Sequence, residues 1–219
     1  MLHSLTEENY LKALYALSHG TDEVTVNELS KQLSIKMPTV TSMMKKLAAK
    51  KLVTYQSYRP LRLTEKGKKE AGIIIRKHRL TEMFLVEVMG FGWEDVHEIA
   101  EQVEHVKSSV FFERMDKMLG YPTIDPHGSP IPDKNGRMEW KPYKKLSDCK
   151  TGSDVRLAAV LNSSADFLKY LNSRELKLGS KLKIKSTEKF DGSMMISFGK
   201  RPPEMLSHTV CTMLLVEDV

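Results

Sequence analysis

The fold is decided by residues 25–49, which read TVNELSKQLSIKMPTVTSMMKKLAA. Thr25 and Glu28 form a capping box, a pair of side chains that satisfies the free N–H groups at the start of a helix. The helical pattern breaks near Ile35 and Lys36, and Pro38 then suits the first turn of a second helix. The stretch therefore predicts two helices joined by a short turn.

The second of these helices is predicted to have one apolar and one polar face. Val40, Met44 and Leu47 are four and three residues apart, so at about 100° per residue they face the core together. The opposite face and the start of the helix carry hydroxyl groups and lysines, which suit the phosphates and base edges of DNA. The predicted DNA-contacting residues of this region are Lys36, Pro38, Thr39, Thr41, Ser42, Lys45 and Lys46. This arrangement is typical of a helix-turn-helix, although an ordinary solvated face is the alternative for any single lysine.

Other elements are expected on both sides of this pair. Ser4 and Glu7 form a second capping box, which predicts an N-terminal helix. Residues 52–64 contain two short extended runs around a turn. Arg59 and Arg62 in this region are predicted to lie near backbone phosphate or a minor groove. The N-terminal third therefore predicts a winged helix that binds double-stranded DNA.

Charge is distributed unevenly along the 219 residues. Residues 1–75 hold 12 Lys and Arg against 7 Asp and Glu, whereas residues 76–140 hold 8 against 12. A basic N-terminal third suits a polyanion, and an acidic middle third suits a cation. Apolar residues at 41% and charged residues at 28% exclude a disordered chain. Since no apolar run approaches the length of about 20 residues that spans a membrane, we expect a cytoplasmic protein.

The middle third carries histidines and carboxylates at helical spacing. We expect a long helix from Thr64 towards Met89, on which His78 and Glu82 lie one turn apart. A further helix is expected over residues 93–120. Four of its side chains fall within an arc of about 100°; they are His97, Glu101, Glu104 and His105.

These side chains have the chemistry of metal ligands. Neighbouring carboxylates repel each other, and a divalent cation removes that repulsion. Imidazole and carboxylate without thiolate suit Mn(II), Fe(II), Co(II) or Zn(II). The two cysteines, Cys149 and Cys211, form no CxxC pair, which argues against a cysteine-rich zinc site. The alternative is a solvated amphipathic helix with incidental histidines.

A family resemblance is carried by three segments, LTEKG at residues 63–67, KHRLTE at 77–82 and VHEIAEQVEHV at 96–106. They resemble the diphtheria toxin repressor family of metal-activated bacterial transcription repressors. The resemblance implies a dimer in which each subunit has a winged-helix domain and a helical dimerisation domain with two metal sites. It implies the ligands Glu101, Glu104 and His105 in a primary site, and His78, Glu82 and His97 in an ancillary site.

The same resemblance points to three further ligand positions. The family takes a ligand from the first helix, where this chain has Asn9, a neutral and weaker donor. Asp125 is a candidate primary ligand, or it caps the turn before Pro126. Asp166 stands where the C-terminal domain can lend a ligand, or it caps a helix. Because Glu101 stands where iron-type members have cysteine, we expect Mn(II) as the metal, with Fe(II) as the alternative.

The C-terminal third predicts a small β domain. Strand-like runs lie at residues 155–160, 181–185, 194–198 and 210–216, with a short helix at 165–171. Asp191 and Gly192 predict a hairpin turn between two of the strands. This part resembles the SH3-like, ferrous-transport-A-type domain of longer family members.

We therefore expect a mainly α fold with small β, organised as three domains. A winged helix-turn-helix is expected at residues 1–72 and a helical dimerisation and metal-binding domain, ending in a proline-rich connector, at 73–142. An SH3-like small β-barrel is expected at 145–219.

The sequence predicts a transcriptional repressor rather than an enzyme, with no catalytic residue assigned. A homodimer loaded with Mn(II) or Fe(II) would bind operator DNA and control metal-uptake genes, with no membrane or organic substrate as partner. Two alternatives from other classes stay open: a winged-helix regulator that senses an organic ligand, and a dinuclear metallohydrolase whose cations activate water.

Overall fold

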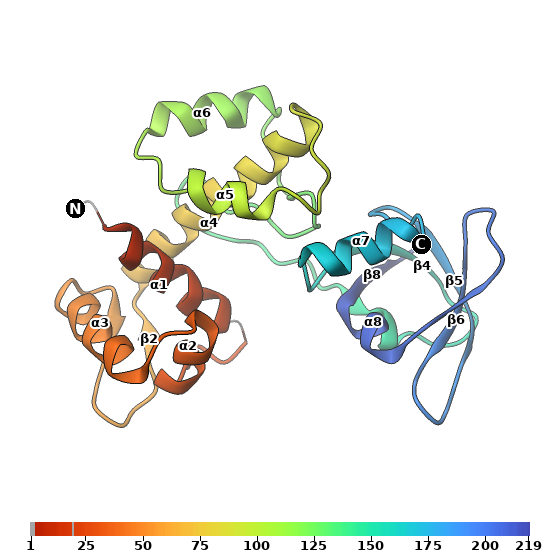
Figure 1. The fold of residues 1–219 in the computed structure, drawn as a ribbon, viewed down its shortest axis with the longest axis horizontal. Coiled ribbons are helices and arrows are strands. Elements are labelled where there is room, and N and C mark those ends of the chain that lie inside the picture. The colour runs from red at the N-terminus through yellow and green to blue at the C-terminus, as the bar shows by residue number, and fades with distance from the viewer. Residues whose placement is uncertain (1–2, 19) are drawn as a thin grey trace. The chain divides into compact units, whose positions relative to one another are not determined.

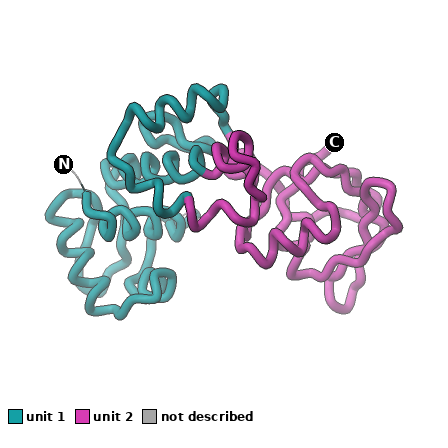
Figure 2. The backbone as a smooth tube through the Cα atoms, turned by 45° about the horizontal axis from the view of Figure 1, so that its top comes forward, with its two compact units in different colours: residues 1–81, 100–123, 131–139 teal, residues 82–99, 124–130, 140–219 magenta. Residues whose placement is uncertain are grey.

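The computed structural model describes residues 3–18 and 20–219, and Figure 1 shows its ribbon. The chain divides into two compact units, which Figure 2 colours separately. The first unit consists of residues 1–81, 100–123 and 131–139, and the second of residues 82–99, 124–130 and 140–219. Each unit has its own hydrophobic core.

The first three helices form as the sequence predicts. Helix α1 (Leu5–Leu17) starts at the Ser4 capping box and α2 (Val26–Leu33) at the Thr25 capping box, and both boxes are fully formed. Helix α3 (Met37–Ala49) follows a short turn. Its predicted core residues are fully buried and share one core with Leu11 and Leu14 of α1 and Leu29 of α2. Figure 1 shows the three helices gathered beside the wing strands.

The wing is a short antiparallel pair, β1 (Val53–Thr54) and β2 (Arg62–Leu63). Helix α4 (Glu65–Glu87) begins directly after it, because the Thr64 hydroxyl accepts a hydrogen bond from the Gly67 N–H at 3.0 Å. Gly67 is required here, since a Cβ would lie 1.9 Å from the carbonyl oxygen of Leu52.

The expectation of a single helix over residues 93–120 is wrong. Helix α5 (His97–Val103) is short, and five residues separate it from α6 (Ser109–Met118). The Ser108 side chain accepts a hydrogen bond from the Phe111 N–H, and this cap starts the new helix. Glu104 directly follows α5, where its N–H still donates to the Ala100 carbonyl at 2.9 Å, and it has no exposed surface.

The second unit is built on a six-stranded antiparallel sheet with the order β3-β8-β4-β5-β6-β7. Its strands are β3 (Lys144–Lys145), β4 (Asp154–Val160), β5 (Lys181–Thr187), β6 (Met194–Phe198), β7 (Glu204–Leu206) and β8 (Leu214–Asp218). A one-turn helix η1 (Leu146–Asp148) and two helices, α7 (Ala165–Ser173) and α8 (His208–Met213), accompany them.

The hairpin turn between β5 and β6 is confirmed: Gly192 has a φ of +71°, and Asp191 accepts from the Ser193 N–H. The strand expected at 210–216 is only half right. Ser207 caps α8 by accepting from the Val210 N–H, so residues up to Met213 are helical and the strand starts at Leu214. The overall class, mainly α with a small β domain, is confirmed. In the described part of the chain no helix is both long and apolar enough to cross a membrane.

Glu7 ties α1 to α3 through a buried carboxylate. One oxygen lies 2.6 Å from Nζ of Lys50 and 3.3 Å from Nζ of Lys46, and the other accepts from the Ser4 N–H. Burial raises the pKa of Glu7, but Lys50, Ser4 and Lys46 together outweigh burial and lower the pKa to about 2.

We predict that Glu7→Gln lowers the free energy of unfolding at pH 7 by about 2 kcal/mol, because a charge-assisted contact is lost. A depressed carboxyl pKa contributes stability above the unfolded value near 4.5, and this stability is lost as the pH falls towards 2. The variant should therefore lose less stability than the wild type over that pH range. Urea unfolding at a series of pH values measures this, with the exposed Glu65→Gln as control; equal pH dependence in both would contradict the prediction.

Candidate metal centres and DNA-contacting face

The first cluster lies within the first unit and is centred on Glu104. It consists of Glu8 and Lys12 from α1, His78 from α4, Glu101 from α5, and Glu104 and His105 from the segment after α5. Nδ1 of His78 lies 2.5 Å from Oε2 of Glu104. Nζ of Lys12 lies 2.7 and 3.0 Å from the two oxygens of Glu104, and 3.4 Å from Oε1 of Glu101. Two helices therefore converge on one buried carboxylate.

The charge of Glu104 is stabilised by these neighbours. Burial alone would raise the pKa of Glu104, but the contact with His78 and the charge of Lys12 outweigh burial, and the pKa lies below its ordinary value. Glu104 is therefore ionised at neutral pH and presents two acceptor oxygens to any cation that enters.

His105 is oriented by α1. Its Nδ1 lies 2.6 Å from Oε2 of Glu8, which leaves Nε2 directed towards Glu104, at 3.6 Å from Oε1. A carboxylate on one imidazole nitrogen is a common way to orient the other nitrogen as a metal ligand. Glu8 is buried, whereas the adjacent Asn9 is half-buried. The first-helix acid of this cluster is thus Glu8, a residue that the sequence analysis did not select although it is the only neighbour of Asn9 with a carboxylate.

The second cluster lies within the second unit and is centred on Glu82 near the end of α4. Its other members are His97, Asp125 and His127. One oxygen of Glu82 lies 3.2 Å from Nδ1 of His97, and the other lies 3.7 Å from Nδ1 of His127. Ligand atoms of Glu82, Asp125 and His127 lie within 4.8 Å of one another, and all three residues are buried.

His127 was missed by the sequence analysis, although it follows Asp125 by two residues in the same proline-rich turn. Its Nε2 lies 2.8 Å from the carbonyl oxygen of Trp93, and the Trp93 ring stacks on the imidazole with centroids 5.9 Å apart. The Nε2–H therefore donates to Trp93, and Nδ1 faces Glu82 as a candidate ligand. Asp125 does cap its turn, since Oδ1 accepts from the N–H groups of His127 and Ser129.

The structure places the remaining predicted ligands as follows. His78 and Glu82 lie one turn apart on α4, as expected, and Asp125 lies with Glu82 in the second cluster. Asp166 is exposed in the first turn of α7, whose N-cap is Ser164. Within the described residues, no metal-sized group of ligand atoms includes Asp166.

The donor atoms of Glu82, Asp125 and His127 lie close enough together for one divalent cation, and the first cluster has the same kinds of donor. Each cluster offers carboxylate oxygens beside imidazole nitrogens, the ligand set that suits Mn(II), Fe(II) or Zn(II). Glu104, Glu82 and His127 are buried, and buried carboxylates need positive charge close by. Cys149 and Cys211 belong to the core around the C-terminal sheet and are free thiols.

Most of the predicted DNA-contacting residues are exposed. Along α3 and its entry, Lys36, Pro38, Thr39, Ser42, Lys45 and Lys46 are exposed and Thr41 is half-buried. Arg59 and Arg62 are exposed on the wing, and Arg62 is ion-paired with Glu23. Two exposed apolar residues share these elements and were not selected from the sequence: Met37 begins α3, and Tyr58 lies fully exposed at the wing tip.

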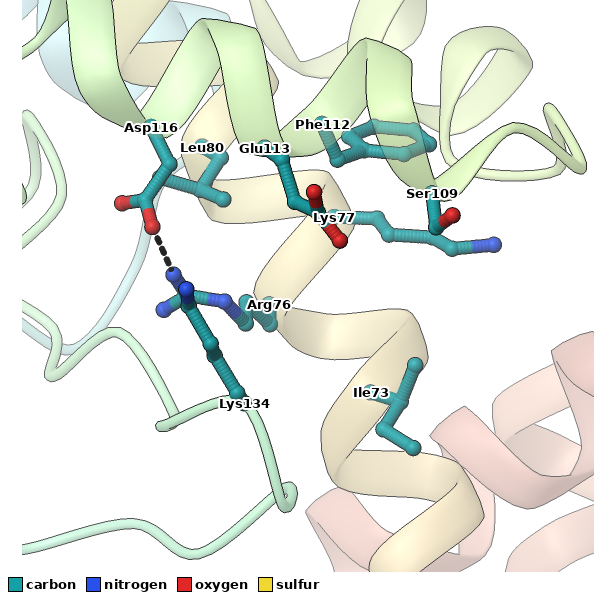
Figure 3. A pocket seen from close by; sticks show the side chains of 9 residues that line it. All are labelled: Ile73, Arg76, Lys77, Leu80, Ser109, Phe112, Glu113, Asp116 and Lys134. Atoms are coloured by element: carbon teal, nitrogen blue, oxygen red, sulfur yellow. Dashed lines mark hydrogen bonds and ion pairs between the residues drawn. The ribbon is translucent and has the colours of Figure 1, made fainter.

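A small hollow lies beside α4 and α6 in the first unit (Figure 3). It encloses about 160 Å³, and Arg76 borders it, donating to Asp116 at 2.5 Å and to the Pro132 carbonyl at 2.6 Å. Of the candidate ligands, none lines it. Pockets for organic ligands usually measure about 300–1,000 Å³, so this hollow does not support the alternative of an organic-ligand sensor.

Comparison with known proteins gives three successive matches along the chain. Residues 2–61 match the model "Iron dependent repressor, N-terminal DNA binding domain", and residues 64–133 match "Iron dependent repressor, metal binding and dimerisation domain". Residues 144–218 match the FeoA domain.

Individual relatives agree with these models. The chain is 38% identical to the iron-dependent repressor IdeR of Mycobacterium tuberculosis over 127 residues, which are 58% of this chain and 55% of that relative, or about half its length. A manganese-dependent transcriptional repressor, solved in complex with manganese, matches with a TM-score of 0.88 and 28% identity, over 97% of this chain and 100% of that one. ScaR with bound Zn²⁺ matches with a TM-score of 0.80 and 34% identity, over 97% and 99% of the two chains.

These matches define a class of DNA-binding transcriptional regulators. The chain belongs to the iron-dependent repressor family, which includes the diphtheria toxin repressor, and the family resemblance seen in the sequence is confirmed. Its relatives are metal-dependent transcriptional repressors, and neither alternative function is supported.

The geometry of the second cluster predicts a shifted titration of His127. Burial lowers the pKa of this imidazole, but the contact with Glu82 and the charges of Glu82 and Asp125 outweigh burial and raise the pKa above 6.5. In metal-free protein, NMR of the imidazole should show a titration midpoint above that value, and Glu82→Gln should shift the midpoint down. A midpoint that Glu82→Gln leaves unchanged would show that the carboxylate does not stabilise the protonated ring.

Proposed function

We propose that this chain is a metal-dependent transcriptional repressor that binds operator DNA as a homodimer when its two clusters hold divalent cations. Mn(II) is the proposed metal and Fe(II) the alternative. The observation that carries the proposal is the first cluster, in which α1 of the winged helix meets α4 and the α5 segment at the buried carboxylate of Glu104.

The proposed first site is formed by Glu101, Glu104 and His105, with His78 and Glu8 beside them. The proposed second site is formed by Glu82, His97, Asp125 and His127. A bound divalent cation supplies the positive charge that neutralises the carboxylates of each site. Oxygen and nitrogen donors without thiolate favour Mn(II) or Fe(II) over a soft metal. Similar proteins have been solved with manganese and with bound Zn²⁺, which supports a divalent cation as the ligand.

The link from metal to DNA is proposed to run through α1. Glu8 holds His105, while Glu7 on the same helix holds Lys50 at the end of α3. Leucines of α1 also pack in the core shared with α2 and α3. Movement of α1 would therefore carry α3 with it. In a dimer, two such helices reach successive major grooves only if their separation is close to one DNA turn, about 34 Å.

The proposed homodimer surface includes α6. Val110 and Met118 on this helix expose more than half of their surface, and Phe111 exposes 43%. Apolar side chains gathered on one helix commonly mark a protein interface. The residues also lie within the segment that matches the metal binding and dimerisation model.

Three domains are proposed, with a winged helix at residues 1–72, a dimerisation and metal-binding domain at 73–142 and an SH3-like domain at 145–219.

We further propose that the repressor works in the cytoplasm, where its operator DNA lies, and that it controls metal-uptake genes. Under this proposal the carboxylates and imidazoles of the clusters bind the cation and do not activate water, so the chain has no enzymatic step.

The central test measures operator affinity with and without metal. In the wild type, Mn(II) should raise affinity by a factor of roughly 5–150, the usual range of coupling between sites. Glu101→Gln combined with Glu104→Gln should remove this increase, because two charged ligands are lost, while Glu188→Gln, at an exposed position after β5, should retain it. Gel shifts with Mn(II), Fe(II) and a chelator measure both. If the operator affinity of the wild type is the same with Mn(II), with Fe(II) and with the chelator, the proposal is refuted.

The DNA-contacting face gives a separate prediction. Lys45→Met should weaken binding similarly for all DNA sequences and should reduce the slope of log affinity against log salt concentration by about 1, since one phosphate contact is removed. Fluorescence anisotropy over a salt series measures the slope. Lys169→Met on α7 removes an equal charge and should leave the slope unchanged; an unchanged slope in Lys45→Met would place this lysine away from phosphate.

A further inference from the structure

Lys12 occupies an unusual place for a lysine, because its ammonium lies among candidate metal ligands. It follows Glu8 by one turn of α1, and its side chain is 22% exposed. Its Nζ contacts both oxygens of Glu104 and one oxygen of Glu101. A cationic side chain of the DNA-binding part thus neutralises the two carboxylates on which the proposed first site depends.

The oxygens of Glu104 cannot bind the Lys12 ammonium and a metal ion at the same time. A carboxylate offers about four lone-pair positions, and here both oxygens accept from Lys12 while Oε2 also contacts His78. A divalent ion bound to a carboxylate lies about 2.0–2.2 Å from the oxygen. An ammonium held 2.7 Å from the same oxygen would lie within a few ångströms of that ion. Two positive charges so close, in an interior of low dielectric constant, repel strongly.

We propose that Lys12 is an internal competitor of the metal: its ammonium balances Glu101 and Glu104 in the metal-free chain, and it must leave before a divalent cation can bind. Lys12 would then set the metal concentration at which the repressor responds. This inference rests on the proposed function, because it assumes that the first cluster is the sensing site.

The exchange would also change how α1 is attached. In the metal-free chain α1 makes two side-chain contacts with the cluster: Lys12 contacts Glu104, and Glu8 contacts His105. Release of Lys12 removes the first attachment and leaves a neutralised cluster beside Glu8. The charge of Glu104 is balanced in both states, so the chain can stay folded without metal and still respond to it.

The test compares Lys12→Met, Lys12→Arg and Lys68→Met in the full-length protein without DNA. Lys12→Met keeps the length of the side chain and removes the competitor, so Mn(II) should bind the first site about tenfold more tightly, a shift that calorimetry resolves readily. Lys12→Arg keeps the charge and should stay near the wild-type affinity. Lys68 pairs with Asp22 and Glu65 at the surface, so Lys68→Met controls for the loss of one positive charge.

A second measurement uses the wild type alone and separates displacement from a general effect of charge. In protein with ¹⁵N-labelled lysine, the ammonium signal of Lys12 should shift towards that of a solvated lysine when diamagnetic Zn(II) fills the first site. The signal of Lys50, which pairs with Glu7, should stay in place. This experiment does not depend on the folding of any variant.

The possible outcomes are distinct. If Lys12→Met binds Mn(II) no more tightly than the wild type, or if the Lys12 signal is unchanged in Zn(II)-saturated protein, Lys12 is a structural ion pair only and the inference is overturned. If the wild type binds neither Mn(II) nor Fe(II), the proposed function fails instead. Tighter binding by Lys12→Met, together with a shifted Lys12 signal, supports the competitor role.

Discussion

The carboxylate of Glu104 has no exposed surface, and a buried negative charge is stable only beside donors and positive charge. This constraint organises the first unit. Lys12 from α1 and His78 from α4 both contact this carboxylate, which lies just after the end of α5. Under the proposed function, a cation bound here would contact the same carboxylate, which would link the position of α1 to the occupancy of the cluster.

In the second cluster, Asp125 and His127 are positioned by a backbone contact between their turn and β4 rather than by the face of a helix. Gly128 approaches β4 so closely that a Cβ would lie 2.2 Å from the carbonyl oxygen of Ala158, and its φ is +87°. The N–H of Val160 donates to the carbonyl of His127. The turn is therefore fixed to the sheet of the second unit, and this attachment directs Asp125 and His127 towards Glu82.

Local sequence signals were sufficient where the structure is local. The capping boxes at Ser4 and Thr25, the buried face of α3 and the hairpin at Gly192 all formed as predicted, because each depends on residues a few positions apart. The two errors, a helix extended through Glu104 and a strand started too early at 210, arose where a serine cap outweighed a continuous apolar or periodic pattern.

The sequence by itself determined the class of the protein: a winged helix with a polar α3 face, a middle segment rich in carboxylates and imidazoles, and a small β domain. The tertiary structure decided which side chains meet. Glu8, and not its neighbour Asn9, contacts His105. His127 lies with Asp125 and Glu82 in the second cluster, and Lys12 contacts Glu104 in the first. These contacts join residues up to 97 positions apart, and helical spacing carries information over only a few turns, so no local pattern could specify them.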